Sequence, residues 1–153
     1  MKSSRKKILL KELSSEIKKS KITALSSRET AKDFRRASRS QQGDRRLYEN
    51  AADLAESKHE ELLEFQKELT QISETESKTV TPFSYVEIKY DDGQVGQLYF
   101  TPKRVQLQNL FLVSQESPLG KAIMNKKLKD KFSFEIPRGE QVTKVSGLIL
   151  KIE

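Results

Sequence analysis

Few side chains in this sequence could carry out chemistry of their own. The chain has no cysteine and a single histidine, His59, inside a long stretch without glycine or proline. Nucleophilic catalysis needs a nucleophile, a base and an orienting group close together, and these residues offer no such set. The six glycines are scattered and form no phosphate-binding loop. We therefore expect no enzyme that acts alone, and a His59 that is either solvated or at the edge of a helical seam.

Arginines supply the pattern that points to a ligand. They cluster near the middle of the N-terminal half, at Arg35, Arg36, Arg39, Arg45 and Arg46. Such a tract suits nucleic acid phosphates. Because no aromatic residue occurs in it before Tyr48, stacking on bases is weakly supported. The sequence predicts phosphate contact without sequence preference, and the alternative is a merely solvated charged face.

Charge is distributed unevenly along the chain, whose net charge is +7. Residues 1–46 hold 15 Lys and Arg against 5 Asp and Glu, a net charge of +10, and residues 47–80 hold 3 against 9, a net charge of −6. Two readings are compatible: the segments pair with each other, or surplus positive charge on the first segment faces nucleic acid.

Two stretches free of helix breakers must position these arginines. No glycine or proline occurs before Gly43 or between residues 44 and 81, which predicts two long helices. Residues at alternating spacings of three and four mark a seam along both: Leu10, Leu13, Ile17, Ser20, Ala24, Ser27, Ala31 and Phe34, then Ala51, Ala55, Lys58, Leu62, Phe65, Leu69 and Ile72. We expect an antiparallel coiled-coil hairpin at residues 1–76, with its tip near residues 41–50. Arms of ~30–40 residues would span roughly 45–60 Å and project.

Beyond a polar boundary at residues 73–82 the pattern changes to a period of two. Residues 85–90 and 95–100 alternate around a turn at Asp92-Gly93, which predicts a β-hairpin. A short strand at 110–114, a short helix at 118–125 and a last hairpin, 132–136 with 142–152 around Arg138-Gly139, complete the pattern. The expected fold class is α+β: the helical hairpin, then a small antiparallel sheet domain with one short helix at residues 80–153.

Composition limits the remaining possibilities. Hydrophobic residues make up 35% of the chain and charged residues 33%, which is low for one compact core and typical of long solvated helices. No apolar run approaches ~20 residues, and the start lacks an apolar signal core. We expect a cytoplasmic, monomeric protein that does not contact membranes.

The most specific motif lies at residues 117–130. Ser117-Pro118 forms a helix-capping turn, Leu119-Gly120 follows, and a basic turn runs from Lys126 to Asp130. This segment resembles the signature of the C-terminal domain of the bacterial Gre transcript-cleavage factors, in which Ser-Pro-Ile/Leu-Gly and Gly-Lys-x-x-x-Asp precede the last two strands. The resemblance covers residues 80–153, and the helical hairpin is similar in length and breaker pattern to that of the family.

The resemblance implies a partner. Gre factors join a coiled-coil hairpin to an FKBP-like domain and insert the hairpin into the secondary channel of RNA polymerase. It implies that the arginine tract lies near the 3′ end of the nascent RNA. It also implies that the docking surface on polymerase is formed by Glu116, Ser117, Pro118, Leu119 and Gly120.

The tip departs from the family pattern. Gre factors carry Gly-Asp-Leu-x-Glu-Asn-Ala, whose two carboxylates help the polymerase hold a second magnesium ion and a water for RNA hydrolysis. The resemblance implies the same role for Asp44 and Glu49, and oxygen ligands suit magnesium in such two-metal sites. Here, however, the two residues are five apart. Both can reach one ion only if residues 45–48 leave helical geometry, so we expect channel occupancy with weak or absent stimulation of cleavage.

Three hypotheses remain open. The first is a Gre-like polymerase-binding factor, either active or cleavage-inactive. The second is an FKBP-like prolyl isomerase with a helical appendage, and the third is a nucleic-acid-binding coiled coil that never contacts polymerase. None requires a cofactor of its own, although the first would share Mg²⁺ with the polymerase.

Overall fold

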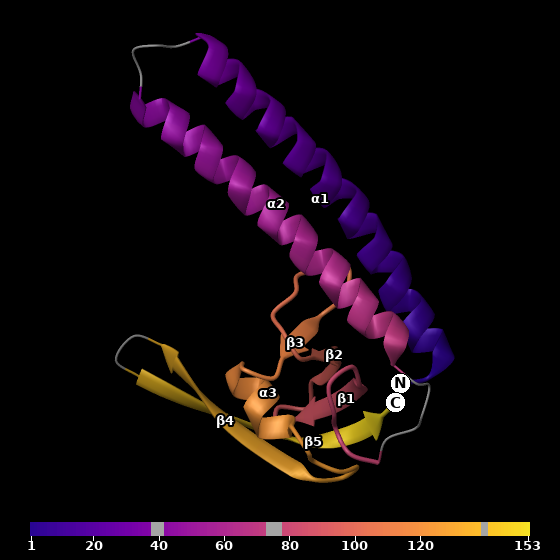
Figure 1. Cartoon of the computed structure of the whole chain (residues 1–153). Coiled ribbons are helices and arrows are strands. Elements are labelled where there is room, and N and C mark those ends of the chain that lie inside the picture. Colours follow the sequence, from indigo (N-terminus) through magenta and orange to yellow (C-terminus); the bar gives the residue numbers. More distant parts are fainter. Residues whose placement is uncertain (38–41, 73–77, 139–140) are drawn as a thin grey trace. The chain divides into compact units, whose positions relative to one another are not determined.

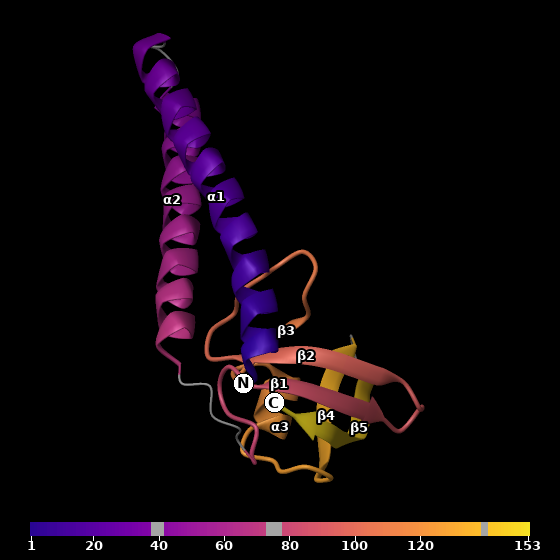
Figure 2. The ribbon, with the colours of Figure 1, turned by 90° about the vertical axis from the view of Figure 1, so that its right-hand side faces the viewer.

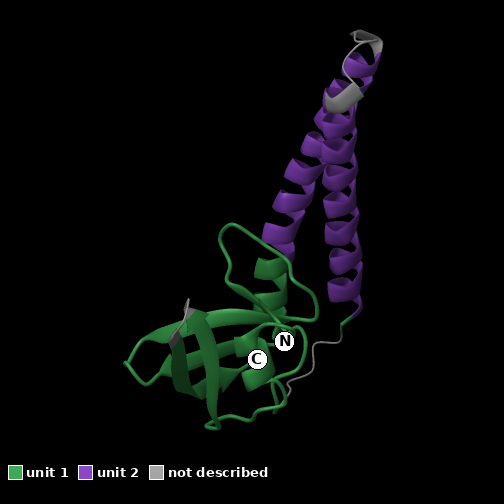
Figure 3. Ribbon diagram, turned by 90° about the vertical axis from the view of Figure 1, so that its left-hand side faces the viewer, with its two compact units in different colours: residues 1–9, 72–153 green, residues 10–71 purple. Residues whose placement is uncertain are grey.

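The chain folds into two compact units. The computed structural model describes residues 1–37, 42–72, 78–138 and 141–153. Unit 1 comprises Met1–Leu9 and Ile72–Glu153, and unit 2 comprises Leu10–Gln71 (Figure 3). The first nine residues, which the sequence placed with the hairpin, thus belong to unit 1. Of the predicted boundary at residues 73–82, residues 73–77 lie outside the described residues.

Unit 2 is an antiparallel pair of long helices, as predicted. They are α1 (Ser3–Ala37), whose first turns lie in unit 1, and α2 (Gln42–Gln71) (Figure 1). Residues 42–50 of the predicted tip are helical. Side-chain contacts fix the register: Gln66 Nε2 donates to Ser14 Oγ at 3.3 Å, and Phe34 stacks on Tyr48 with ring centroids 3.9 Å apart. Within the described residues, no helix is both long enough and apolar enough to cross a membrane.

The seam between the helices follows the predicted frame in α1 and is shifted by one residue in part of α2. Leu13, Ser20, Ala24 and Ala31 are buried, as expected. At the first predicted seam position of α2, Ala52 is buried and Ala51, the residue expected there, is exposed. Lys58, also predicted in the seam, is exposed because its ammonium group stays in water. The predicted frame holds from there on, at Leu62, Phe65 and Leu69.

His59 occupies the seam position that Lys58 was expected to fill. Its Nδ1 lies 2.8 Å from Ser20 Oγ, and the same hydroxyl donates to the Ile17 carbonyl at 2.9 Å. A serine hydroxyl has one proton, so with that proton on the carbonyl the hydroxyl accepts from His59 Nδ1–H. The single histidine is therefore a structural residue of the helix pair.

Unit 1 is a curled five-stranded sheet with a short helix (Figures 1 and 2). The elements are β1 (Tyr85–Tyr90), β2 (Val95–Thr101), β3 (Leu112–Ser114), α3 (Pro118–Ile123), β4 (Lys131–Arg138) and β5 (Gln141–Ile152), in the sheet order β3-β2-β1-β5-β4. The expected α+β class is confirmed. The sheet is mixed rather than wholly antiparallel, because residues 102–111 return the chain so that β3 runs parallel to β2.

The core of unit 1 lies between α3 and the sheet. Its buried members are Val80, Val86, Ile88, Leu98, Phe100, Val113, Leu119, Ile123, Phe132 and Ile149. Alternation in the strands places these side chains on one face. The turn of the first hairpin uses Gly93 at φ +89°, a conformation that glycine adopts readily. Of the last turn, residues 139–140 lie outside the described residues.

A charged cluster on unit 1 attaches the first turns of α1 to the sheet. Arg5 lies 3.8 Å above the Tyr85 ring and pairs through Nε with Glu153 Oε2 at 3.3 Å. Lys2 and Lys151 contact Glu153 Oε1 at 2.9 and 3.0 Å. The hydrogen bond from Lys2, with those from Lys151 and Arg5, lowers the pKa of the Glu153 carboxyl to about 2. We call Lys2, Arg5, Tyr85, Lys151 and Glu153 the terminal cluster.

Candidate functional site

The signature segment forms the rigid start of α3. Ser117 is the N-cap: its hydroxyl accepts from the Gly120 N–H at 3.0 Å and donates to the Ser114 carbonyl at 2.8 Å. Pro118 occupies the first helical turn, where its missing N–H has no consequence. These two residues fix the path by which the chain leaves β3 and enters α3.

Gly120 is required by a close backbone approach. A Cβ atom at this position would lie 1.9 Å from the Ser114 carbonyl oxygen and 2.9 Å from Ser117 Oγ. Only a residue without a side chain lets α3 pack this closely on the end of β3. The Ser-Pro-Leu-Gly pattern is therefore explained by local structure: cap, helix start, core residue and close contact.

The basic turn after α3 also has a structural basis. Asn125, at the position of the first glycine in the family pattern, has φ +60°, a conformation that asparagine tolerates. Its N–H donates to the Val80 carbonyl at 2.9 Å. Asp130 Oδ2 accepts from the Lys127 N–H at 2.7 Å and closes the turn. Because Ile149 N–H also donates to the Asp130 carbonyl at 3.1 Å, this turn links the segment before β1 to β5.

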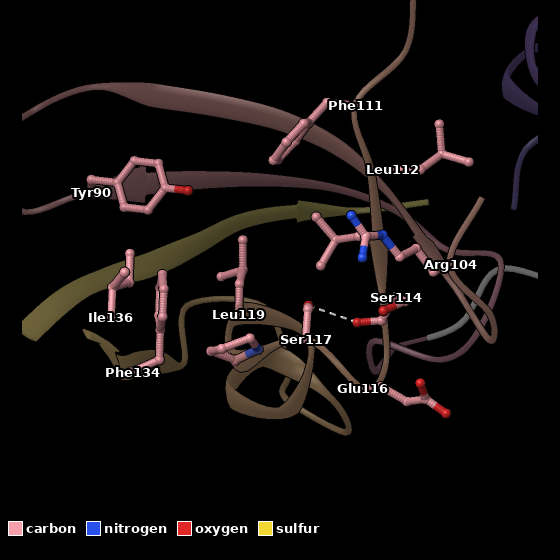
Figure 4. A pocket seen from close by; sticks show the side chains of 12 residues that line it. Tyr90, Arg104, Phe111, Leu112, Ser114, Glu116, Ser117, Leu119, Phe134 and Ile136 are labelled. Carbon is pink, nitrogen blue, oxygen red and sulfur yellow. Dashed lines mark hydrogen bonds between the residues drawn. The ribbon is translucent and has the colours of Figure 1, made fainter. Parts of the chain in front are cut away.

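An apolar groove of about 700 Å³ opens beside the signature segment (Figure 4). Tyr90, Phe134 and Ile136 line one side, and Phe111 and Leu112 line it near β3. Two charged residues, Arg104 and Glu116, also border it. Phe111 is 60% exposed and continues the apolar lining onto the surface. We call this feature the unit 1 groove.

The five residues predicted to dock on a partner divide into two groups. Leu119 and Gly120 are buried, and Leu119 also reaches the floor of the groove. Glu116 and Pro118 are exposed, and Ser117 is half-buried. The docking assignment stays a prediction, and the surface that could make contact consists of the groove edge at Glu116–Pro118 rather than all five side chains.

Sequence reasoning missed the aromatic lining of the groove. Tyr90, Phe111 and Phe134 all fall in segments that the sequence predicts as strands, and no groove was predicted there. Tyr90 and Phe134 do pack partly against the core, but Phe111 does not. A signal was present in Leu110-Phe111-Leu112-Val113, because four consecutive apolar residues cannot all face one side of a strand.

The second candidate site is the helical tip of unit 2. Glu49 Oε1 accepts from Arg35 Nη2 at 2.6 Å and from Arg45 Nε at 3.3 Å. The hydrogen bond from Arg35, followed by that from Arg45, lowers the pKa of the Glu49 carboxyl. Arg46 is exposed. Arg39 lies outside the described residues, and of Arg36 only the helical backbone is described.

The two tip carboxylates do not converge. Residues 42–71 form one continuous helix, and residues five apart on a helix point about 140° away from each other. Glu49 is engaged by two arginines, and the described residues contain no group of three or more acidic or histidine side chains able to hold a metal. This arrangement does not fit a magnesium ion shared by Asp44 and Glu49. The shared ion stays a prediction about the tip once it is bound to polymerase.

A further arginine joins the helices below the tip. Arg28 Nη2 pairs with Asp53 Oδ1 at 3.0 Å, and its guanidinium also binds the Glu56 carboxylate. The hydrogen bond to Glu56 raises the pKa of Arg28. The opposite charges of the two helices thus serve helix pairing at least in part, which is one of the two explanations that the sequence suggested for the uneven charge.

Comparison with known proteins now adds to this geometry. Residues 74–149 match the family model for the C-terminal domain of the transcription elongation factors GreA and GreB. That range holds the capped helix, the Asp130 turn and four of the five strands in full. The chain belongs to the Gre family of transcription elongation factors. No curated protein sequence matches it significantly.

Solved structures of Gre-type proteins resemble the chain only loosely. GreA factor homolog 1 (Gfh1) of Thermus thermophilus is 13% identical, with 94% of each chain covered and a TM-score of 0.41. Thermus aquaticus Gfh1 is 15% identical, with 93% of this chain and 92% of that chain covered and a TM-score of 0.41. GreA/GreB from Nitrosomonas europaea is 21% identical over 68% of this chain and 91% of that one, with a TM-score of 0.38. The assignment to the Gre family therefore rests on the family model.

Proposed function

We propose that this Gre-family chain binds bacterial RNA polymerase at the secondary channel, with the tip of the helical hairpin directed toward the active site. The observation that carries the proposal is the match of residues 74–149 to the Gre C-terminal model, on a chain that also has two helices of 35 and 30 residues. It acts in the cytoplasm as a monomer, and the arginine tract lies near the 3′ end of the nascent RNA.

The unit 1 groove is the surface we propose for docking on polymerase. It offers an exposed aromatic anchor, Phe111, beside the rigid edge of Glu116 and Pro118. Interface energy is usually concentrated in a few such anchors, with charged residues at the rim. Arg104 and Glu116 would then select the orientation of the partner rather than supply most of the affinity.

A binding assay with core RNA polymerase tests this proposal. Phe111→Ser should weaken binding about tenfold, because loss of an interface anchor commonly costs more than ~1 kcal/mol. Val95→Ser is the matched control, since Val95 is 56% exposed on β2 and does not line the groove. Equal binding by both variants would exclude the groove, and no binding by the unmodified chain would refute the function.

We also propose that the channel-bound factor stimulates transcript cleavage weakly or not at all. Support comes from the tip, where Asp44 and Glu49 lie on different sides of one helix and Glu49 is paired with Arg35 and Arg45. Positive charge this close to a carboxylate opposes binding of a cation. Backtracked elongation complexes incubated with the chain should release few 3′ RNA fragments. Robust release that is abolished by Asp44→Ala or Glu49→Ala would contradict this.

A prolyl isomerase is the second candidate, because three aromatic side chains line the groove. That lining is the property we expect of an FKBP-like active site. Turnover of a proline-containing test peptide, measured alongside binding to core RNA polymerase, separates the candidates. Turnover lost in Phe111→Ser but kept in Val95→Ser would favour the isomerase.

A further inference from the structure

The seam of unit 2 changes from apolar to ionic toward the tip. Leu62, Phe65 and Leu69 are fully or almost fully buried in one half of α2. In the other half the buried side chains Ala31 and Ala52 are small, and the described contacts between helices include Arg28 with Asp53 and Glu56, Arg35 with Glu49, and the stacked rings of Phe34 and Tyr48. Helix pairing near the tip therefore depends on Arg28 and on Arg35, and Arg35 also belongs to the proposed RNA-binding tract.

One carboxylate oxygen of Glu49 accepts hydrogen bonds from two arginines of the proposed RNA-binding tract. Arg35 reaches Glu49 Oε1 from α1, and Arg45 reaches the same atom from one turn earlier in α2. The side chains of Arg35 and Arg45 remain 61% and 45% exposed, so a solvent-borne anion can approach both. A guanidinium that forms a hydrogen-bonded pair with a carboxylate has fewer N–H donors left for a phosphate.

A small cavity lies beside this ion pair. It has a volume of about 200 Å³ and is lined by Arg28, Ala31, Lys32, Arg35 and Glu49. Three of these five residues are basic, and Glu49 is the one acidic residue. An anion that enters there meets the guanidinium of Arg35 next to the carboxylate with which it must compete.

We propose that Glu49 is an intramolecular competitor of RNA: its carboxylate occupies Arg35 and Arg45, and a phosphodiester backbone binds by displacing it from them. The inference rests on the RNA-facing role in the proposed function and adds its regulation. RNA binding then releases the Glu49 carboxylate and breaks the α1–α2 ion pair nearest the tip. While they are paired with Glu49, Arg35 and Arg45 bind RNA weakly. The Glu49 carboxylate becomes exposed only when an RNA phosphate has replaced it at these arginines.

Affinity for free RNA measures this competition without polymerase. Fluorescence anisotropy with a labelled short oligo-uridine, at fixed low salt, compares the full chain with Glu49→Gln. We expect about two- to fivefold tighter binding by Glu49→Gln, the range that corresponds to loss of one exposed ion pair. Glu61→Gln is the matched control: Glu61 is exposed, makes no ion pair within the described residues, and lies about 18 Å along α2, beyond the screening length.

A second arm separates competition from simple charge repulsion. In a chain that already carries Arg35→Gln and Arg45→Gln, Glu49→Gln should no longer tighten binding, because no arginine is left to release. An equal gain in both backgrounds would overturn the inference, as would unchanged affinity of Glu49→Gln in the otherwise unmodified chain. Because polymerase is absent, failure to dock on polymerase would leave this result standing, and failure here would leave docking standing.

Discussion

At the scale of single residues, the signature that identifies the family is explained mainly by folding. Ser117 caps α3, Leu119 fills the core and Gly120 permits the contact with Ser114. Glu116 and Pro118 are the neighbours that remain on the surface. The sequence was sufficient to predict the cap from the Ser-Pro pair, but not the need for Gly120, since that need depends on a carbonyl six residues earlier.

Gly120→Ala should destabilise unit 1 by at least about 2 kcal/mol, because the new methyl group would overlap the Ser114 carbonyl oxygen and the backbone must shift. Urea unfolding measures the loss. Gly93→Ala is the comparison: Gly93 has φ +89° but nothing within 4 Å of an added Cβ, so strain alone should cost about 1 kcal/mol. A Gly120→Ala chain as stable as Gly93→Ala would contradict the close approach.

Lys129→Gly should stabilise unit 1 by about 0.5 kcal/mol. Lys129 has φ +68°, which costs a residue with a side chain about 1 kcal/mol, and the extra freedom of glycine in the unfolded chain offsets part of the gain. The free energy of unfolding checks this, with Lys127→Gly as the control. Lys127 is not among the described residues with positive φ, so its replacement should destabilise the turn. Equal effects of the two changes would show that the backbone at Lys129 is not strained.

At the scale of elements, breaker positions and periodicity predicted every helix and strand of the described chain within a few residues. The exceptions have physical causes. The seam frame failed at Lys58 because periodicity treats all residues alike, whereas an ammonium group stays in water and an imidazole can bond Ser20. The tip was predicted near residues 41–50, yet α2 begins at Gln42, since one glycine does not end a helix by itself. The direction of β3 depends on a long connection that no local pattern describes.

The terminal cluster should make the stability of unit 1 depend on pH. The pKa of Glu153 is about 2 in the folded protein, below the value of about 4.3 expected for glutamate in the unfolded chain. The stabilisation is therefore complete above the unfolded value and is lost as pH falls toward 2.

Unfolding of Glu153→Gln across this range provides the test. The difference in free energy of unfolding between the unmodified chain and the variant should be constant near neutral pH and should shrink between pH of about 4.3 and 2. Glu116→Gln, which removes an exposed carboxylate that forms no ion pair in the described part of unit 1, should show no such trend. A pH-independent difference for Glu153→Gln would mean that its ion pairs do not form.

At the scale of the whole molecule, the chain combines a unit that carries the Gre signature with a pair of helices whose tip is rich in arginine. The family assignment could be predicted from residues 117–130, whereas the pairing of Glu49 with Arg35 could not. Arg35 and Glu49 are 14 positions apart and meet only because α1 and α2 are antiparallel in this register, whereas Arg45 and Glu49 lie one turn apart on the same helix. Entry of this tip into the polymerase channel, as we propose, involves the chain and its partner together.

Cross-linking from the tip to core RNA polymerase tests that claim most directly. A photo-reactive amino acid replaces Leu47, which is 68% exposed near the start of α2. In a separate variant it replaces Ile22, which is 69% exposed near the middle of α1 and therefore farther from the tip. We expect Leu47 to cross-link to polymerase segments next to the active site and Ile22 to segments nearer the channel mouth. A bound chain whose Leu47 position cross-links only to the outer surface of polymerase would contradict it.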